Sequence, residues 1–129
     1  METATAKEAK ITGIDISTFL IKDADRAIKF WRDTMGLTPS HVFEGRGAEF
    51  ILDDGSTFGI WKMDDDSWRP GSGIMLAVPD IKRAIEFYRA RGVKVSDSEE
   101  SPVCHMAFAE DTEGNHFIIH QRKDATQSQ

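Results

Sequence analysis

An internal repeat restricts the possible folds of this chain more than any other part of its sequence. Residues 23–33 read DADRAIKFWRD and residues 80–90 read DIKRAIEFYRA, with six identities at a constant offset of 57. In both copies the apolar positions follow the three-four spacing of one buried helical face, and an Asp stands where an N-cap belongs. Two copies at so long a period do not make a solenoid. The repeat therefore predicts two similar modules related by a pseudo-twofold axis.

The residues around each predicted helix follow the same order in both halves. In the first half a helix over 24–35, which ends at Gly36, lies among strands expected at 11–21, 40–43, 48–52 and 57–62. In the second half a helix that opens at Pro79-Asp80 and closes at Gly92 lies among strands expected at 73–78, 93–95, 103–109 and 116–121. Each half thus reads βαβββ, which predicts an α+β fold.

The composition fits one globular domain. A chain of 129 residues with 40% hydrophobic and 29% charged residues has enough apolar surface to build a core. The expected organisation is a polar tail at 1–10, a two-module domain at 11–122 and a polar tail at 123–129. Within that domain a linker at 63–72, rich in acidic residues, Pro and Gly, divides module one (11–62) from module two (73–122).

Charge and cysteine content limit the partners. The net charge is −6 and the Lys and Arg residues are spread along the chain, which argues against nucleic acid and anionic membrane surfaces as partners. No apolar run is long enough to span a bilayer and the first residues lack the apolar stretch of a secretory signal, so a cytoplasmic location is expected. The single cysteine, Cys104, rules out an internal disulfide framework, and on a strand it would point away from its neighbour His105 as a buried, inert thiol.

Three segments carry a resemblance to a known family. IKDADRAIKFWRDTMGL, its echo VPDIKRAIEFYRARGV and the closing AFAEDTEGNHFIIHQRK resemble the vicinal oxygen chelate superfamily, which includes glyoxalase I, fosfomycin-resistance proteins, extradiol dioxygenases and bleomycin-resistance proteins. The resemblance covers roughly residues 11–122. It implies two βαβββ modules whose curled mixed sheets form a half-open barrel around a cavity. It also implies a homodimer, in which some members exchange modules between chains.

The same resemblance implies where a divalent metal would bind. In metal-using members the first and last strands of each module each offer one ligand position, and these positions hold Ile16, Gly59, Gly73 and Ile118 here. None of these side chains donates an electron pair to a metal, so no cofactor is expected. A displaced site would draw on Asp15, Glu49, His105 or His120. His116 and His120 cannot hold one ion together, because four residues along a strand separate them by roughly 13 Å.

Strand alternation separates two sets of side chains. The set facing the helices is uniformly apolar, as a core requires: Phe19, Ile21, Phe58, Ile60, Ile74, Leu76, Phe117 and Ile119. The opposite set is predicted to line the ligand cavity: Ile16, Thr18, Trp61, Met75, His116, Ile118 and His120. Trp61 and His120 occupy equivalent places in the two modules, so the pseudo-twofold would set them on opposite sides of the cavity. Trp61 would stack a flat ligand, and His120 would hydrogen-bond it.

Two functional classes remain at this point. One is a metal-independent binding protein that sequesters or carries a small, flat, partly apolar molecule. The other is a lyase, isomerase or dioxygenase that uses either a displaced divalent metal or His120 as a general base. In both cases the expected partners are a small molecule and a second copy of the chain.

Overall fold

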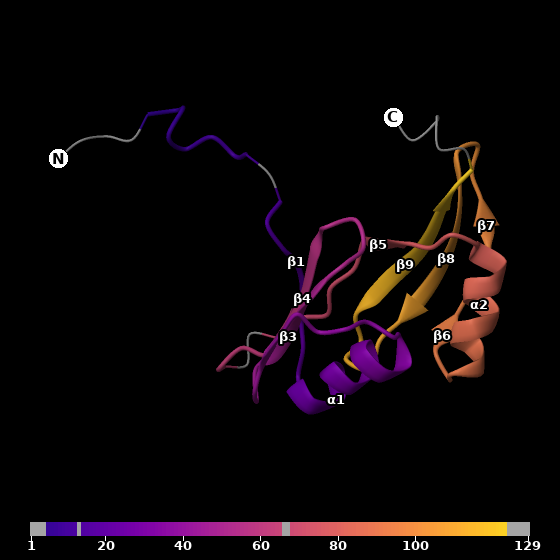
Figure 1. Ribbon diagram of the computed structural model, residues 1–129, viewed down its shortest axis with the longest axis horizontal. Coiled ribbons are helices and arrows are strands. Elements are labelled where there is room, and N and C mark those ends of the chain that lie inside the picture. Colours follow the sequence, from indigo (N-terminus) through magenta and orange to yellow (C-terminus); the bar gives the residue numbers. More distant parts are fainter. Residues whose placement is uncertain (1–4, 13, 66–67, 124–129) are drawn as a thin grey trace.

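The structure of the protein is a computed structural model that describes residues 5–12, 14–65 and 68–123. The expected tails and linker therefore lie partly outside the described residues. Figure 1 shows two sheets side by side, with α1 below them and α2 along the second. No helix in the described ranges is long and apolar enough to span a bilayer.

The first module has the predicted order with one added feature. It comprises β1 (Ser17–Leu20), α1 (Ala24–Lys29), the π-helical turn η1 (Phe30–Thr34), β2 (His41–Phe43), β3 (Gly47–Ile51) and β4 (Thr57–Trp61). The sheet order is β1-β4-β3-β2, and β1 runs parallel to β4. The predicted single helix is in fact an α-helix that widens into η1, where the Met35 N–H donates to the Phe30 carbonyl at 2.8 Å.

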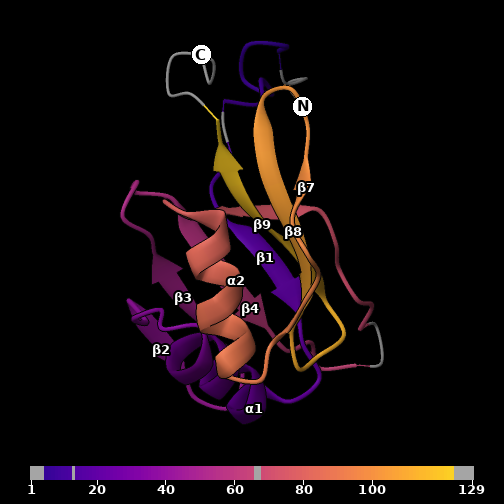
Figure 2. The same ribbon diagram turned by 90° about the vertical axis from the view of Figure 1, so that its right-hand side faces the viewer.

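The second module repeats this order. It comprises β5 (Ile74–Ala77), α2 (Ile81–Ala90), β6 (Lys94–Val95), β7 (Glu99–Glu100), β8 (Cys104–Glu110) and β9 (His116–Arg122). Its sheet order is β5-β9-β8-β6, and the short strand β7, which was not predicted, pairs with β8. In Figure 2 α2 lies in front of this sheet. The structure confirms two mixed sheets, but they do not close into a barrel within one chain.

Local bonds confirm the pseudo-twofold. The side chains of Asp23 and Asp80 accept the N–H groups of Arg26 and Arg83, so both helices start with the predicted cap. The last hairpins of the two modules also match, since Leu52 N–H donates to the Ser56 carbonyl at 2.8 Å and Asp111 N–H donates to the Asn115 carbonyl at 2.9 Å. The offset is 57 in the helices and 59 in the hairpins.

One prediction about the first strand is wrong. The strand was expected from residue 11, but β1 begins at Ser17 because only residues 17–20 have β4 as a partner. Ile11 and Ile14 are 88% and 86% exposed, in spite of their apolar side chains. Residues 11 and 14 therefore contribute nothing to the core of this chain.

The core lies where strand alternation predicts it. Six of the eight helix-facing side chains are at most 2% exposed, and Ile74 and Leu76 are partly buried. Trp31, which is fully buried, packs between the two sheets, with ring centroids 4.7 Å from Phe58 and 4.9 Å from Phe117. Helix α1 and η1 therefore belong to the hydrophobic core of both modules.

Candidate functional site

The face of the first sheet that points away from the helices carries several of the predicted ligand-binding residues. Thr18 pairs with Gly59, and a Cβ placed on Gly59 would lie 3.3 Å from both Ile16 Cγ2 and Thr18 Oγ1. Glu49 lies directly across from Gly59 on β3 and so shares this face, which the sequence left open. We call this surface the outer face of the first sheet.

An aromatic cluster extends this outer face. The rings of His41 and Phe43 are stacked with centroids 4.2 Å apart, and Phe43 meets Trp61 edge-on at 5.4 Å. The strand register explains the cluster, because Phe43 pairs with Gly47, and Gly47 pairs with Trp61. Gly47 has no side chain, so the two aromatic rings meet across it. The sequence predicted Trp61 as a ligand-binding residue but did not predict His41 and Phe43. The one pattern that indicates these two residues is their alternation on the short strand β2.

The outer face of the second sheet holds the other predicted residues. Met75 pairs with Ile118, and Ile118 pairs with Phe108, which sequence reasoning also missed. Two residues further along β9, His120 pairs with Ala77 on β5 and with Met106 on β8. Met75 and Phe108 are 54% and 43% exposed, which leaves a largely apolar surface open.

His116 lies at the margin of the second outer face. Its Nε2 is 3.4 Å from the Glu110 carboxylate on the neighbouring strand. His116 and His120 are both on β9, a strand, as predicted from the sequence.

The two outer faces are not brought together within one chain. Trp61 belongs to the first sheet and His120 to the second, and no ring contact, hydrogen bond or pocket of the described residues joins them. The predicted positions of these residues across a common cavity therefore stay a prediction for an assembly of more than one chain.

The residues at the metal positions of the superfamily do not fit a metal. Ile16 and Gly59 lie together on the first outer face, as two ligands would, but neither has a donor atom. The displaced candidates are spread out: Glu49 is on the first sheet, and His105 and His120 lie on opposite faces of the second. Asp15 precedes β1 and is exposed. No three metal-binding side chains among residues 5–12, 14–65 and 68–123 are grouped around one point.

Cys104 is placed as expected. It is buried at 6% exposure, and its sulfur lies 3.1 Å from the Ser101 hydroxyl. His105 follows it on β8, pairs with Gln121 and lies 4.0 Å from Glu100. The alternation of β8 separates the thiol and the imidazole, so they do not form a catalytic pair.

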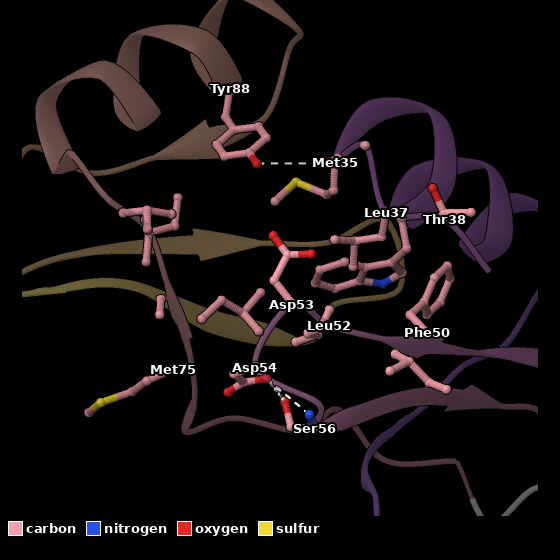
Figure 3. Close-up of a pocket in the computed structure, with 17 residues that line it drawn as sticks. Met35, Leu37, Thr38, Phe50, Leu52, Asp53, Asp54, Ser56, Met75 and Tyr88 are labelled. Atoms are coloured by element: carbon pink, nitrogen blue, oxygen red, sulfur yellow. Dashed lines mark hydrogen bonds between the residues drawn. The ribbon is translucent and has the colours of Figure 1, made fainter. Parts of the chain in front are cut away.

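A pocket of about 520 Å³ opens between the modules, on the helix side of the sheets (Figure 3). Its walls come from the end of the first helix, the β3–β4 turn, β5 and α2, and include Leu37, Leu52, Asp53 and Tyr88. Of the predicted ligand-binding residues only Met75 lines it. No sequence pattern indicated this pocket, because its shape depends on how the two modules are placed.

With the fold and these surfaces described, comparison with known proteins places the chain in a family. The chain belongs to the glyoxalase/bleomycin resistance protein/dioxygenase superfamily, whose family model matches residues 13–119. This confirms the resemblance found in the sequence.

Individual relatives differ in what their names describe. A probable chloroplastic lactoylglutathione lyase from Arabidopsis thaliana is 30% identical over an alignment of 122 residues that covers 81% of this chain but only 34% of that protein. The chain thus spans about a third of the length of this relative. Among solved structures, an antibiotic binding protein from Streptomyces sp. CB03234 is similar with a TM-score of 0.70 and 21% identity, covering 88% of this chain and 98% of its own. A lactoylglutathione lyase from Agrobacterium tumefaciens has a TM-score of 0.72 and 16% identity, covering 86% and 94%.

Proposed function

We propose that the chain is a cytoplasmic, metal-independent binding protein that sequesters or carries a small, flat, partly apolar molecule. The observation that carries this proposal is the aromatic cluster of His41, Phe43 and Trp61 on an open sheet face. Flat ligands stack on such rings, and each stacked pair contributes about 0.5–1.5 kcal/mol beyond the area it buries. The antibiotic binding protein with the same fold agrees with this reading.

We propose further that the ligand site is completed in a homodimer. The outer faces leave Ile16, Trp61, Met75 and Phe108 between 36% and 54% exposed, which is typical of an interaction surface. Among the strands that the structure describes, β1 and β5 each lie at a sheet edge with one side unpaired. A second copy that sets its second sheet over the first sheet of its partner would place Trp61 across a cavity from the His120 of the other copy.

Quenching of tryptophan fluorescence tests the binding proposal. Flat aromatic metabolites and drugs are titrated into the protein and into the variants Trp61→Phe and Phe43→Ala. We expect at least one ligand whose dissociation constant rises about tenfold in both variants, since stacking and aromatic area are lost. The control is Trp68→Phe, because Trp68 lies outside the outer faces, where its ring makes a cation–π contact with the Lys22 ammonium group. If no ligand distinguishes Trp61→Phe from this control, the binding proposal is wrong.

A second candidate function is catalysis of the lyase or isomerase kind. The observation in its favour is the 30% identity to a probable lactoylglutathione lyase. Because the family's metal positions lack donors in this chain, His120 would have to act as a general base on the bound ligand. Protein purified without chelators and supplied with nickel, zinc, manganese and iron tests the metal. About one tightly held ion per chain would overturn metal independence.

A further inference from the structure

The two modules meet at two junctions that the pseudo-twofold makes equivalent. At the first, the β8–β9 turn of module two reaches the start of α1 through Glu113. The pseudo-twofold relates this turn to the β3–β4 turn of module one, with Asp54 in the place of Glu113, and relates the start of α1 to the start of α2. The matched hairpin bonds given above fix this equivalence.

The first junction is closed by hydrogen bonds. Glu113 accepts from Arg26 and from the backbone N–H groups of Lys22 and Asp23. Asn115, which is fully buried, donates to the Leu20 carbonyl at 3.1 Å and accepts the Gly71 N–H at 2.7 Å. These hydrogen bonds join the turn directly to the start of α1.

The second junction is open. Asp54 accepts the N–H and the hydroxyl of Ser56 within its own turn, at 3.0 and 2.6 Å, and bonds to nothing on α2. The Arg83 side chain, equivalent to that of Arg26, makes no hydrogen bond or ion pair with any described residue. The pocket of about 520 Å³ lies beside this turn, and α2 contributes only Tyr88 to its wall.

The pocket is apolar inside and acidic at one wall. Its interior is formed by side chains such as Leu37, Phe50, Leu52 and Ile119. Asp53 and Asp54 also line it, and no Lys, Arg or His of the described residues does. Figure 3 shows the Asp53 carboxylate directed toward Met35, whereas Asp54 turns toward Ser56. Tyr88 closes the top by donating to the Met35 carbonyl at 3.3 Å.

A buried donor at the pocket has no acceptor. Trp31 lines the pocket and is fully buried, and its indole N–H has no hydrogen-bond partner among the described residues. A buried, unpaired N–H costs about 1–3 kcal/mol, so native structures usually satisfy it. The nitrogen is itself closed off from solvent, so a ligand in the pocket does not contact it. The indole nevertheless borders the pocket, and its resonance therefore reports on binding there.

We propose that this inter-module pocket is a second ligand site, distinct from the aromatic cluster on the first outer face, that binds a flat apolar amine in its protonated form. The ring system fits the apolar interior, and Asp53 pairs with the ammonium group at the pocket wall. The volume lies in the range of small-molecule sites. An anionic ligand is disfavoured because the pocket holds two carboxylates and no cation.

The test uses 9-aminoacridine, a flat aromatic cation at neutral pH, and anthracene-9-carboxylate as the matched anion. Binding is followed by the three tryptophan indole N–H resonances in ¹H–¹⁵N spectra, assigned with Trp61→Phe and Trp68→Phe. We expect the chemical shift of the Trp31 indole N–H to change with 9-aminoacridine concentration until it reaches a plateau. The anion should leave this chemical shift unchanged. In Asp53→Lys the dissociation constant should rise at least about tenfold, since an attraction becomes a repulsion.

The control is Asp25→Lys, which makes the same charge change at an exposed position of α1 outside the pocket. Its dissociation constant should stay within about twofold of the wild type, because exposed charges at a distance are screened. Three results would each overturn the proposal: equal affinity in Asp53→Lys and wild type, equal binding of the anion, or a shift of the Trp61 resonance alone. The last result would place the probe on the outer face and leave the proposed function intact.

Discussion

Arg26 and Glu113 are joined by two hydrogen bonds, Nε to Oε2 at 2.5 Å and Nη2 to Oε1 at 3.0 Å. The Glu113 side chain is fully buried, whereas that of Arg26 is half exposed. Because Glu113 lies in the β8–β9 turn and Arg26 lies on α1, this pair links the second module to the first. The placement of the modules, and with it the pocket on the other side, depends on this contact.

Glu113→Ala should lower the free energy of unfolding by about 2–3 kcal/mol. The substitution leaves the backbone N–H groups of Lys22 and Asp23 without acceptors in a partly buried place, and the two losses together cost about 2–3 kcal/mol. The half-exposed Arg26 returns to water and adds little. Urea unfolding followed by circular dichroism measures the change. Asp54→Ala, at the equivalent position of the open junction, is the matched control and should cost less than about 1 kcal/mol.

The contribution of Glu113 should depend on pH. Burial raises the pKa of Glu113, but the hydrogen bonds from Arg26, Asp23 and Lys22 outweigh burial and bring this pKa below its usual value. A carboxyl group whose pKa is lower in the folded state stabilises the protein above its unfolded pKa, and this stability is lost as the pH falls through the folded pKa. Glu113→Gln should therefore destabilise more at pH 7 than below about pH 4, in urea unfolding at each pH.

Asp111, the first residue of the same turn, should show the opposite trend. Burial raises the pKa of Asp111, although hydrogen bonds from Asn115 and from the Glu113 N–H oppose the shift. A raised carboxyl pKa favours folding below the unfolded pKa, and this stability is lost as the pH rises through the folded pKa. Asp111→Asn should thus destabilise less at pH 7 than near pH 4. Parallel pH trends for the Asp111→Asn and Glu113→Gln variants would contradict the assignment of opposite shifts.

The sequence predicted the features that depend on local patterns. The offset of 57 identified both modules, and the Asp and Gly residues at the helix ends marked helix starts and stops that the structure confirms. Alternation also separated the core face from the outer face. In each case the deciding interaction is a few residues away along the chain, or on a strand whose pairing follows from the repeat.

What the sequence missed depends on contacts between distant segments. The cluster of Phe43 with Trp61 requires the register of three strands, which short strands do not reveal. The pocket requires the relative placement of the modules, and this is fixed by Glu113 and Asn115 through bonds that span about ninety residues. The late start of β1 follows from the length of its partner β4 and not from its own apolar pattern.

Gly47→Ala should be among the most destabilising single changes in the first sheet. A Cβ at Gly47 would lie 1.9 Å from the Ile60 carbonyl oxygen, so backbone atoms must move. We expect a loss of about 3 kcal/mol or more, as for overpacked sites. Gly59→Ala is the matched control on the same face, because its Cβ would meet the side chains of Ile16 and Thr18 at 3.3 Å and the Ala48 carbonyl oxygen at an ordinary 3.7 Å. Thermal unfolding of the two variants should differ clearly, and equal melting temperatures would contradict the close approach at Gly47.

Phe108→Lys should convert the proposed dimer into monomers that remain folded. Phe108 is 43% exposed on the outer face of the second sheet, beside Ile118, so a cation there would be buried against the partner at a cost of several kcal/mol. The matched control is Phe87→Lys on α2, since Phe87 is 51% exposed but lies on a helix away from the outer faces. Sedimentation velocity should find a monomer for Phe108→Lys and a dimer for Phe87→Lys and the wild type. A wild-type monomer at all concentrations, or a Phe108→Lys dimer, would rule out an assembly built on this face, because a lysine ammonium has no partner in an apolar interface.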